Sequence, residues 1–309
     1  MKVCQAICVK HIASRNLKNG KAVIIASDSI PLVVESEIAD MLIEDPMYLN
    51  NFNQDVKLIF EQSGYFQKPE EEAKTMPIEQ TTTRWNLYRK LFLFVGILSL
   101  IIIISALPFT EGIPTGNKIL AQNVPFFYTL LCVLLVAVLT SLLHEYMHIF
   151  FSHSGKRLKN IIRVQFINST ATVSMSHIWV WSLFSRLIAL SAGLISDLFL
   201  LAMVTITQIF ISYWVLIVTS AVLWVRILWQ FRFQKKCDGQ LLIQTLMDNP
   251  LFGDVIELTD NPLEQRKEKN IFRILKTIGY TINALLLIFW CLPFILSMYR
   301  YLINYVSMN

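Results

Sequence analysis

Two histidines and a glutamate lie within five residues in the stretch HEYMH, residues 144–148. On a helix His144 and His148 share one face, because they are four residues apart, so both imidazoles can reach a single zinc ion. Glu145 lies beside them, where its carboxylate can act as general base on a water molecule whose pKa the metal lowers. The spacing predicts a metal site with hydrolytic chemistry, against the alternative of three interfacial polar residues without a metal.

A catalytic zinc site needs a third protein ligand and leaves its fourth position to water. His153 follows His148 by five residues, about 140° round a helix, and points away unless the helix has ended. Asp197 lies in the middle of a long apolar stretch, and Asp238 lies just beyond the end of that stretch. The choice between them depends on how the chain is arranged around HEYMH.

The composition predicts a polytopic membrane protein that is mainly α-helical. Of its 309 residues 54% are hydrophobic and only 16% are charged, and the mean hydropathy is +0.51, too apolar for an ordinary soluble domain. The formal charge of +5 gives no indication of nucleic-acid binding. The five cysteines are scattered and odd in number, which argues against a disulfide-stapled fold.

Four stretches with few or no charges account for about five membrane-spanning helices. Residues 91–107, 124–143 and 278–299 predict one span each. Residues 187–225 contain one charged acidic residue, Asp197, and fit two spans joined by a turn near residues 208–212. The span at 124–143 continues into HEYMH without a helix breaker, so the two histidines are expected at the end of a membrane helix.

The basic residues predict the orientation, because Lys and Arg concentrate on the cytoplasmic side of membrane proteins. They cluster after HEYMH and after the fourth span, whereas the opposite side carries only Lys118 and Arg300. We therefore expect a multi-pass protein of the cell membrane with a cytoplasmic N-terminus and an outer C-terminus. Asp238 then lies on the same side as HEYMH, which makes it the preferred third ligand.

Residues 1–86 predict a small cytoplasmic α+β domain with a linker, followed by the multi-spanning domain at 87–309. Strands are expected at 21–27 and 30–36, and helices at 37–45 and from 51 to Gly64. The pattern resembles the small winged-helix domains that hold precursor peptides in ribosomal-peptide modification systems. A generic regulatory domain is the alternative.

Residues 138–251 resemble the site-2 protease type of intramembrane zinc metalloproteases. HEYMH matches the HExxH motif of that family, SAGLISD resembles its Ala-Gly-Pro-like motif, and Cys237-Asp238-Gly239 its Asp-Gly motif. The resemblance implies one zinc ion per chain, held by His144, His148 and Asp238, with Glu145 as catalytic base.

Two departures from the family pattern concern residues near the metal. The chain lacks the Asn and Pro that often precede the Asp-Gly motif, and Asp197 stands where an Asn often follows Ala-Gly, so an Asn-based contact does not carry over. The stretch CDGQLLIQTLMDNPLF looks closer to the branch related to peptide zinc metalloproteases of peptide-maturation systems.

A β-hairpin is expected between the second and third spans. IIRVQF, residues 161–166, and TATVSMS, residues 170–176, both alternate apolar and polar residues around a turn at Asn168. Its edge could pair with an extended substrate, so that Val164, Phe166, Asn168 and the nearby Asp197 become candidate substrate contacts. The alternatives are a hairpin that only packs on the membrane surface, and an Asp197 that lines a water path or is structural.

The expected function is zinc-dependent endopeptidase activity in or at the membrane, near its cytoplasmic face. Membrane-inserted or amphipathic peptides in peptide maturation or regulated proteolysis would be the substrates, and the lipid bilayer the other partner. The alternative is a non-catalytic membrane protein of the same fold that acts in peptide binding, immunity or transporter assistance. The sequence leaves the oligomeric state open.

Overall fold

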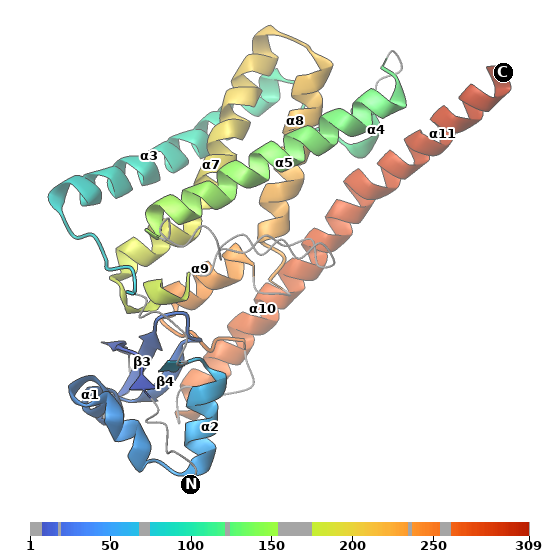
Figure 1. The fold of residues 1–309 in the computed structure, drawn as a ribbon. Helices are drawn as coiled ribbons and strands as arrows, with labels where there is room; N and C mark the ends of the chain where they lie inside the picture. The colour runs from blue at the N-terminus through green and yellow to red at the C-terminus, as the bar shows by residue number, and fades with distance from the viewer. Residues whose placement is uncertain are drawn as a thin grey trace. The chain divides into compact units, whose positions relative to one another are not determined.

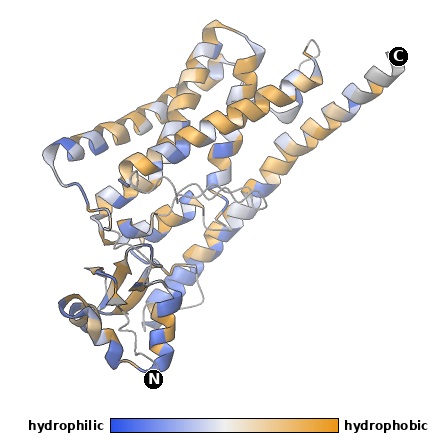
Figure 2. Cartoon of the chain, in the orientation of Figure 1, coloured by the Kyte–Doolittle hydropathy of each residue, from blue (hydrophilic) through white to orange (hydrophobic). Residues whose placement is uncertain are grey.

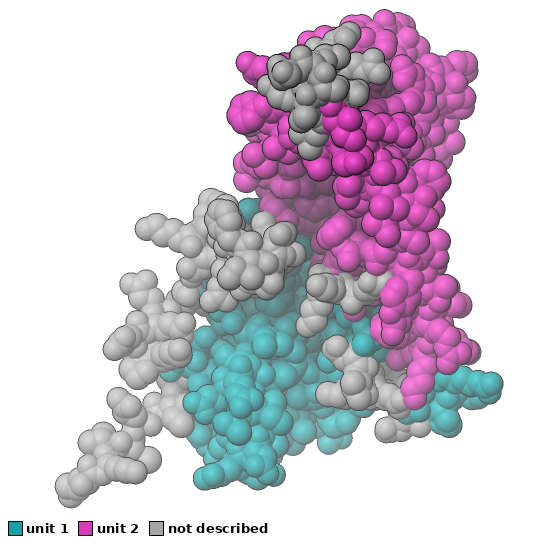
Figure 3. All heavy atoms as spheres, turned by 90° about the vertical axis from the view of Figure 1, so that its right-hand side faces the viewer, with its two compact units in different colours: residues 1–81, 149–189, 244–266 teal, residues 82–148, 190–243, 267–309 magenta. Residues whose placement is uncertain are grey.

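The computed structural model describes residues 8–17, 20–67, 75–120, 124–153, 175–233, 237–253 and 261–308. Most of these residues are helical, and the strands form two small sheets. The chain divides into two compact units, which Figure 3 draws in different colours. Unit 1 comprises residues 1–81, 149–189 and 244–266, and unit 2 comprises residues 82–148, 190–243 and 267–309.

A three-stranded antiparallel sheet forms the centre of the N-terminal part of unit 1. The strands β2 (Ile12–Asn16), β3 (Lys21–Ala26) and β4 (Leu32–Glu35) lie in the order β2-β3-β4. β3 is central and apolar after its first residue, and residues 22–26 of it are buried. The strands predicted near residues 21–27 and 30–36 are confirmed. The sequence does not predict β2, since its polar Ser14-Arg15-Asn16 end lacks the apolar alternation of a half-buried strand.

Helices pack on this sheet, and a second, two-stranded sheet pairs β1 (Cys8–Val9) with β5 (Phe66–Gln67). The helical elements are α1 (Ser36–Glu44), the 3-10 helix η1 (Pro46–Asn51) and α2 (Gln54–Gln62). The side chain of Asn53 accepts the N–H of Val56, so α2 begins three residues later than the helix that the sequence predicts. The buried Tyr65 hydroxyl donates to the carbonyl of Ile24 at 2.7 Å, which satisfies a polar group inside the core.

Asp248 joins three segments of unit 1 that are far apart in sequence. It accepts two hydrogen bonds from Arg15 of β2, at 2.7 and 3.0 Å, and one from Arg186 at 3.0 Å. Nε of Arg15 also donates to the carbonyl of Trp179, at 2.7 Å, in the 3-10 helix η4 (Ser176–Val180). β2 is thereby bonded to residues 164 and 233 positions further along the chain.

Most of unit 2 consists of the remaining helices, which are drawn in Figure 1. In chain order they are α3 (Thr83–Ala106), η2 (Leu107–Phe109), α4 (Gly116–Ile119), α5 (Phe126–Phe151), α7 (Leu183–Phe210), α8 (Trp214–Gln230), α9 (Asp238–Leu246), α10 (Pro262–Leu286), the π-helical η5 (Leu287–Cys291) and α11 (Leu292–Met308).

Within the described residues, four helical segments are long and apolar enough to cross a membrane: Thr83–Phe109, Phe126–Phe151, Leu183–Phe210 and Pro262–Tyr301. Figure 2 shows that hydrophobic residues dominate the first three of them and the later part of the fourth. Many of these side chains are exposed, among them Leu134, Leu139 and Leu142 of α5, which are more than half exposed. Apolar surface of this extent is typical of lipid contact, so the prediction of a helical membrane protein is confirmed at this level.

The long apolar stretch at 187–225 is divided as the sequence predicts. α7 ends at Phe210 and α8 begins at Trp214, so the break lies within two residues of the expected turn at 208–212. α8 is apolar but has 17 residues and is shorter than the four long segments.

The hairpin predicted at 161–176 falls almost entirely on residues 154–174, which lie outside the described residues. The candidate substrate contacts Val164, Phe166 and Asn168 lie there too. Its final residue, Ser176, begins the 3-10 helix η4.

Candidate metal centre

His144 and His148 lie one turn apart near the end of α5, as their spacing predicts. Both side chains are buried, with 5% and 2% of their residue surface exposed. Their ring centroids are 4.8 Å apart, and their Nε2 atoms are 3.2 Å apart. Because α5 continues without a break to Phe151, the helix itself fixes the two imidazoles on one face.

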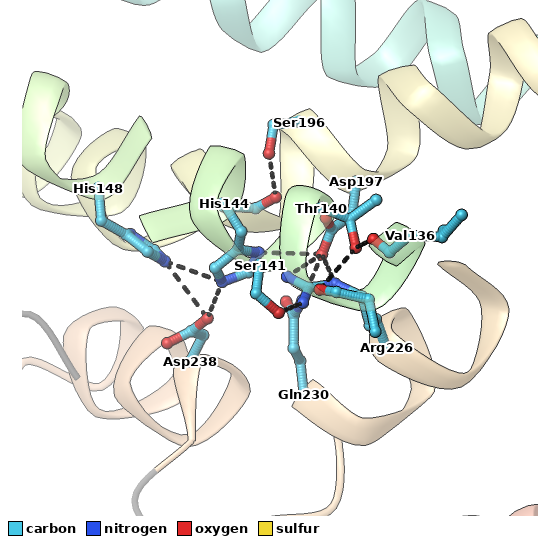
Figure 4. A network of polar contacts seen from close by, with 12 residues as sticks. Val136, Thr140, Ser141, His144, His148, Ser196, Asp197, Arg226, Gln230 and Asp238 are labelled. Atoms are coloured by element: carbon cyan, nitrogen blue, oxygen red, sulfur yellow. Dashed lines mark hydrogen bonds and ion pairs between the residues drawn. The ribbon is translucent and has the colours of Figure 1, made fainter. Parts of the chain in front are cut away.

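Asp238, the first residue of α9, completes a group of three side chains that could hold a metal ion. Its Oδ2 lies 3.0 Å from Nε2 of His144 and 3.4 Å from Nε2 of His148 (Figure 4). Around a tetrahedral ion with bonds of about 2.1 Å, neighbouring ligand atoms are about 3.4 Å apart. The three atoms therefore have nearly the separations that one ion requires, and this group could hold a metal ion.

Asp238 is held in its ionised form by its two histidine neighbours. Burial, the largest single influence, raises the pKa of Asp238, but hydrogen bonds and charge interactions with His144 and His148 together outweigh it and hold that pKa below its usual range. An ionised carboxylate is the form that binds a metal. The side chain of Asp238 is 22% exposed, whereas those of His144 and His148 are 6% and 2% exposed, so the carboxylate forms the most accessible part of the group.

Glu145 follows His144 on α5 and is half-buried. Its carboxylate interacts electrostatically with His148, His144 and Asp238, which places it close to the group without belonging to it. Glu145 therefore lies near the three potential ligands but is not one of them.

A second carboxylate, Asp197 of α7, lies behind His144. Its Oδ2 is 2.9 Å from Nδ1 of His144 and also accepts a hydrogen bond from Nε2 of Gln230 at 2.9 Å. Arg226 of α8 approaches the same oxygen to 3.5 Å and donates to the hydroxyl of Ser141 on α5. Figure 4 shows that Asp197 and Asp238 flank His144 from opposite sides.

Two glycines allow the helices to approach closely at this centre. A methyl group at Gly193 of α7 would overlap the imidazole ring of His144. A methyl group at Gly239 would lie 2.6 Å from the carbonyl oxygen of Gln230, so this glycine lets α9 reach the end of α8. These glycines belong to the SAGLISD and Cys-Asp-Gly stretches, which gives both motifs a packing role.

The structure brings together four of the predicted site residues, His144, Glu145, His148 and Asp238. Asp197 is fully buried against His144. Its contact with a substrate stays a prediction. His153 follows the end of α5 in a left-handed conformation, with φ of 53°, and its ring lies 5.7 Å from that of Trp181. It is not part of the His144, His148 and Asp238 group.

The sequence does not predict the polar contacts of Ser141, Arg226 and Gln230 at this centre. Arg226 and Gln230 are four residues apart at the end of an apolar helix, and a lone acid, Asp197, lies in the preceding one. An acid in one apolar helix and an arginine in the next indicate a contact between the two, because charges within membrane helices usually pair with one another.

Comparison of the chain with protein-family models, curated proteins and solved structures yields no match. The convergence of His144, His148 and Asp238, with Glu145 beside them, is thus the main structural observation that bears on function.

Proposed function

We propose that this protein is a zinc-dependent endopeptidase of the site-2 protease type, which hydrolyses peptide bonds of membrane-inserted or amphipathic substrates. The observation that carries the proposal is the approach of Asp238 to within 3.0 and 3.4 Å of two histidines that belong to an HExxH sequence. The second candidate, a non-catalytic protein of the same fold, has no use for an acid at position 145.

The donor set fits zinc better than the hard cations. Two imidazole nitrogens and one carboxylate oxygen are common zinc ligands, whereas Mg²⁺ and Ca²⁺ prefer oxygen alone. A zinc ion at this position would polarise the substrate carbonyl and lower the pKa of an adjacent water molecule.

In the proposed reaction, Glu145 transfers protons and the other three residues hold the metal. Glu145 accepts a proton from the attacking water as the new C–O bond forms, and it returns a proton to the amide nitrogen as the C–N bond breaks. His144 and His148 on α5 and Asp238 at the start of α9 would hold the metal rather than transfer protons.

The membrane arrangement supports substrates that enter from the bilayer. HEYMH lies in the last three turns of α5, a candidate span, so the centre is expected at the cytoplasmic end of that helix. A transmembrane substrate must first unwind there, because helical backbone groups are already paired.

We further propose that α8 is the fifth span. Its 17 residues correspond to a length of about 26 Å, near the lower limit for crossing a hydrocarbon core of about 30 Å. Its three-residue connection to α7 also leaves little room for any path other than a return through the bilayer.

The test compares purified full-length protein with its Glu145→Gln variant in liposomes, each loaded with zinc. The probe is a mixture of peptides from digested membrane proteins in heavy-oxygen water, so that hydrolysis places heavy oxygen in each new carboxyl terminus. The exposed Glu111 provides a matched control, Glu111→Gln.

We expect labelled termini from the wild type and from Glu111→Gln, and a rate at least about 100-fold lower from Glu145→Gln, because general bases commonly contribute that much. Zinc content should be equal in all three proteins. Equal labelling by wild type and Glu145→Gln, or no labelling by the zinc-loaded wild type, would contradict the proposal.

A further inference from the structure

We propose that Asp197 is a positioning residue for the metal: it accepts the Nδ1 proton of His144 and thereby directs Nε2 of that ring at the ion. This inference deepens the proposed function and rests on it, since it assumes that His144 binds a metal. It assigns to Asp197 a role through His144 rather than through the substrate.

The two ring nitrogens of His144 face two different carboxylates. Nδ1 lies 2.9 Å from Oδ2 of Asp197, and Nε2 lies 3.0 Å from Oδ2 of Asp238 (Figure 4). A neutral imidazole has one N–H and one lone pair. With the N–H held by Asp197, the lone pair is on Nε2, the nitrogen that faces His148 and Asp238.

Asp197 is itself held by side chains from a neighbouring helix. Gln230 donates to its Oδ2 at 2.9 Å, and the guanidinium of Arg226 lies 3.5 Å from the same oxygen. The positive charge of Arg226 compensates a carboxylate that is fully buried in an apolar helix, where an uncompensated charge would be costly.

The chain of polar contacts around Asp197 ends on α5, the helix that carries His144. Arg226 also donates to the hydroxyl of Ser141, which precedes His144 on α5 by three residues. The contacts therefore run from α5 through α8 and α7 and back to α5, and they fix the imidazole plane relative to three helices. Partners of this kind orient metal ligands, and their removal typically weakens metal affinity about 10- to 100-fold.

The burial of Asp197 distinguishes a role in positioning His144 from a role in binding the substrate. Asp197 is 0% exposed, and the ring of His144 lies between it and Asp238. A change at Asp197 should therefore act on the metal even when no peptide is present.

The test measures zinc affinity by chelator competition and records the visible spectrum of the Co²⁺-loaded protein, both without substrate. The variant Asp197→Asn keeps the shape of the side chain and removes its charge. The control Thr205→Val removes a buried hydrogen bond from the same helix, that of Thr205 to the carbonyl of Leu201 at 2.7 Å, without touching the centre.

We expect Asp197→Asn to bind zinc about 10- to 100-fold more weakly and to shift the Co²⁺ bands, because a neutral amide accepts the Nδ1 proton of His144 less strongly than a carboxylate does. Thr205→Val should keep wild-type affinity and spectrum even if it unfolds at a lower temperature. If Asp197→Asn does not fold, the double variant Asp197→Asn with Arg226→Gln removes both charges together, and it should show the same loss of affinity.

Wild-type affinity and an unchanged Co²⁺ spectrum in the Asp197 variants would overturn the inference and leave Asp197 a structural residue. That outcome would leave the proposed function intact. A wild-type protein that binds no zinc would instead overturn the metal centre itself, so the two failures are distinguishable.

Discussion

The imidazole of His144 lies directly against the backbone of α7 at Gly193, where a side chain of any size would overlap the ring. We predict that Gly193→Ala displaces the ring and weakens zinc binding by at least about 10-fold, the lower end of the effect of disturbing a ligand's surroundings. Zinc titration of the purified variant measures this change.

Gly96→Ala is the matched control, because it makes the same substitution in another candidate span. The added methyl group would lie 2.9 Å from Cγ1 of the buried Ile195 side chain and does not contact His144, so it should reduce stability and leave zinc affinity unchanged. Unaltered zinc binding by Gly193→Ala would show that the contact between α7 and His144 does not position the ligand.

Residue spacing in the sequence predicts part of this centre and cannot predict the rest. The four-residue interval between His144 and His148 determines that they share a face, because helix geometry is local. The contacts of Asp197 with His144 and Arg226 depend on how α5, α7 and α8 rotate against one another. An apolar membrane helix gives little indication of that rotation, since its lipid-facing and buried sides are both hydrophobic.

Among the elements, β2 and α7 are joined through Asp248, which accepts hydrogen bonds from Arg15 and Arg186. Burial, the largest single influence, raises the pKa of Asp248, but the two guanidinium groups together hold it below its usual range. The ionised carboxylate therefore stabilises the fold at every pH above the ordinary value of about 3.9, and this contribution is lost as the pH falls through the lower folded-state value.

We predict that Asp248→Asn lowers the free energy of unfolding by about 1–3 kcal/mol at pH 7, because it weakens hydrogen bonds to two charged partners. The difference from wild type should stay constant down to about pH 5 and shrink below about pH 4. Intrinsic tryptophan fluorescence during unfolding at each pH provides the measurement.

Glu111→Gln is the control for this prediction, because the ion pair of Glu111 with Lys118 is largely exposed. The accessible fraction is 62% for the side chain of Glu111 and 37% for that of Lys118. Exposed pairs contribute little, so the variant should unfold like wild type. A constant difference between wild type and Asp248→Asn down to pH 3 would contradict the assigned role of the carboxylate.

The elements that local sequence patterns define are the ones that the sequence predicts well. The break between α7 and α8 and the strands at 21–27 and 30–36 follow from hydropathy and turn residues. The sequence does not predict β2, because this strand is stabilised by its pairing with β3 and its own residues do not indicate a strand.

For the whole molecule, the number of membrane crossings decides on which side the chain ends. In the part of the chain that the structure describes, the four long segments and the shorter α8 give an odd number of crossings if α8 crosses and an even number if it does not. With five crossings and a cytoplasmic N-terminus, we predict that a C-terminal alkaline phosphatase fusion is active and a C-terminal fluorescent-protein fusion is dark. Fusions after residue 233, beyond α8, should behave in the opposite way, because basic residues concentrate on the cytoplasmic side.

If a fusion at the N-terminus places that end in the cytoplasm, the reverse pattern at the C-terminus would show that α8 does not cross the membrane. The assignment of residues 149–189 and 244–266 to unit 1 is a feature that the sequence could not reveal. It involves contacts such as that between Arg15 and Asp248, 233 residues apart, and no local pattern encodes a contact of that range.

The measurement that most directly tests the central claim is the metal content of the purified protein and of its Asp238→Ala variant, determined by mass spectrometry. The control is Asp55→Ala, which changes an exposed acid in the first turn of α2. We predict about one zinc ion per chain in the wild type and the control, and loss or marked weakening of zinc binding in Asp238→Ala. An unchanged zinc content in Asp238→Ala would contradict the assignment of His144, His148 and Asp238 as the ligands of one ion.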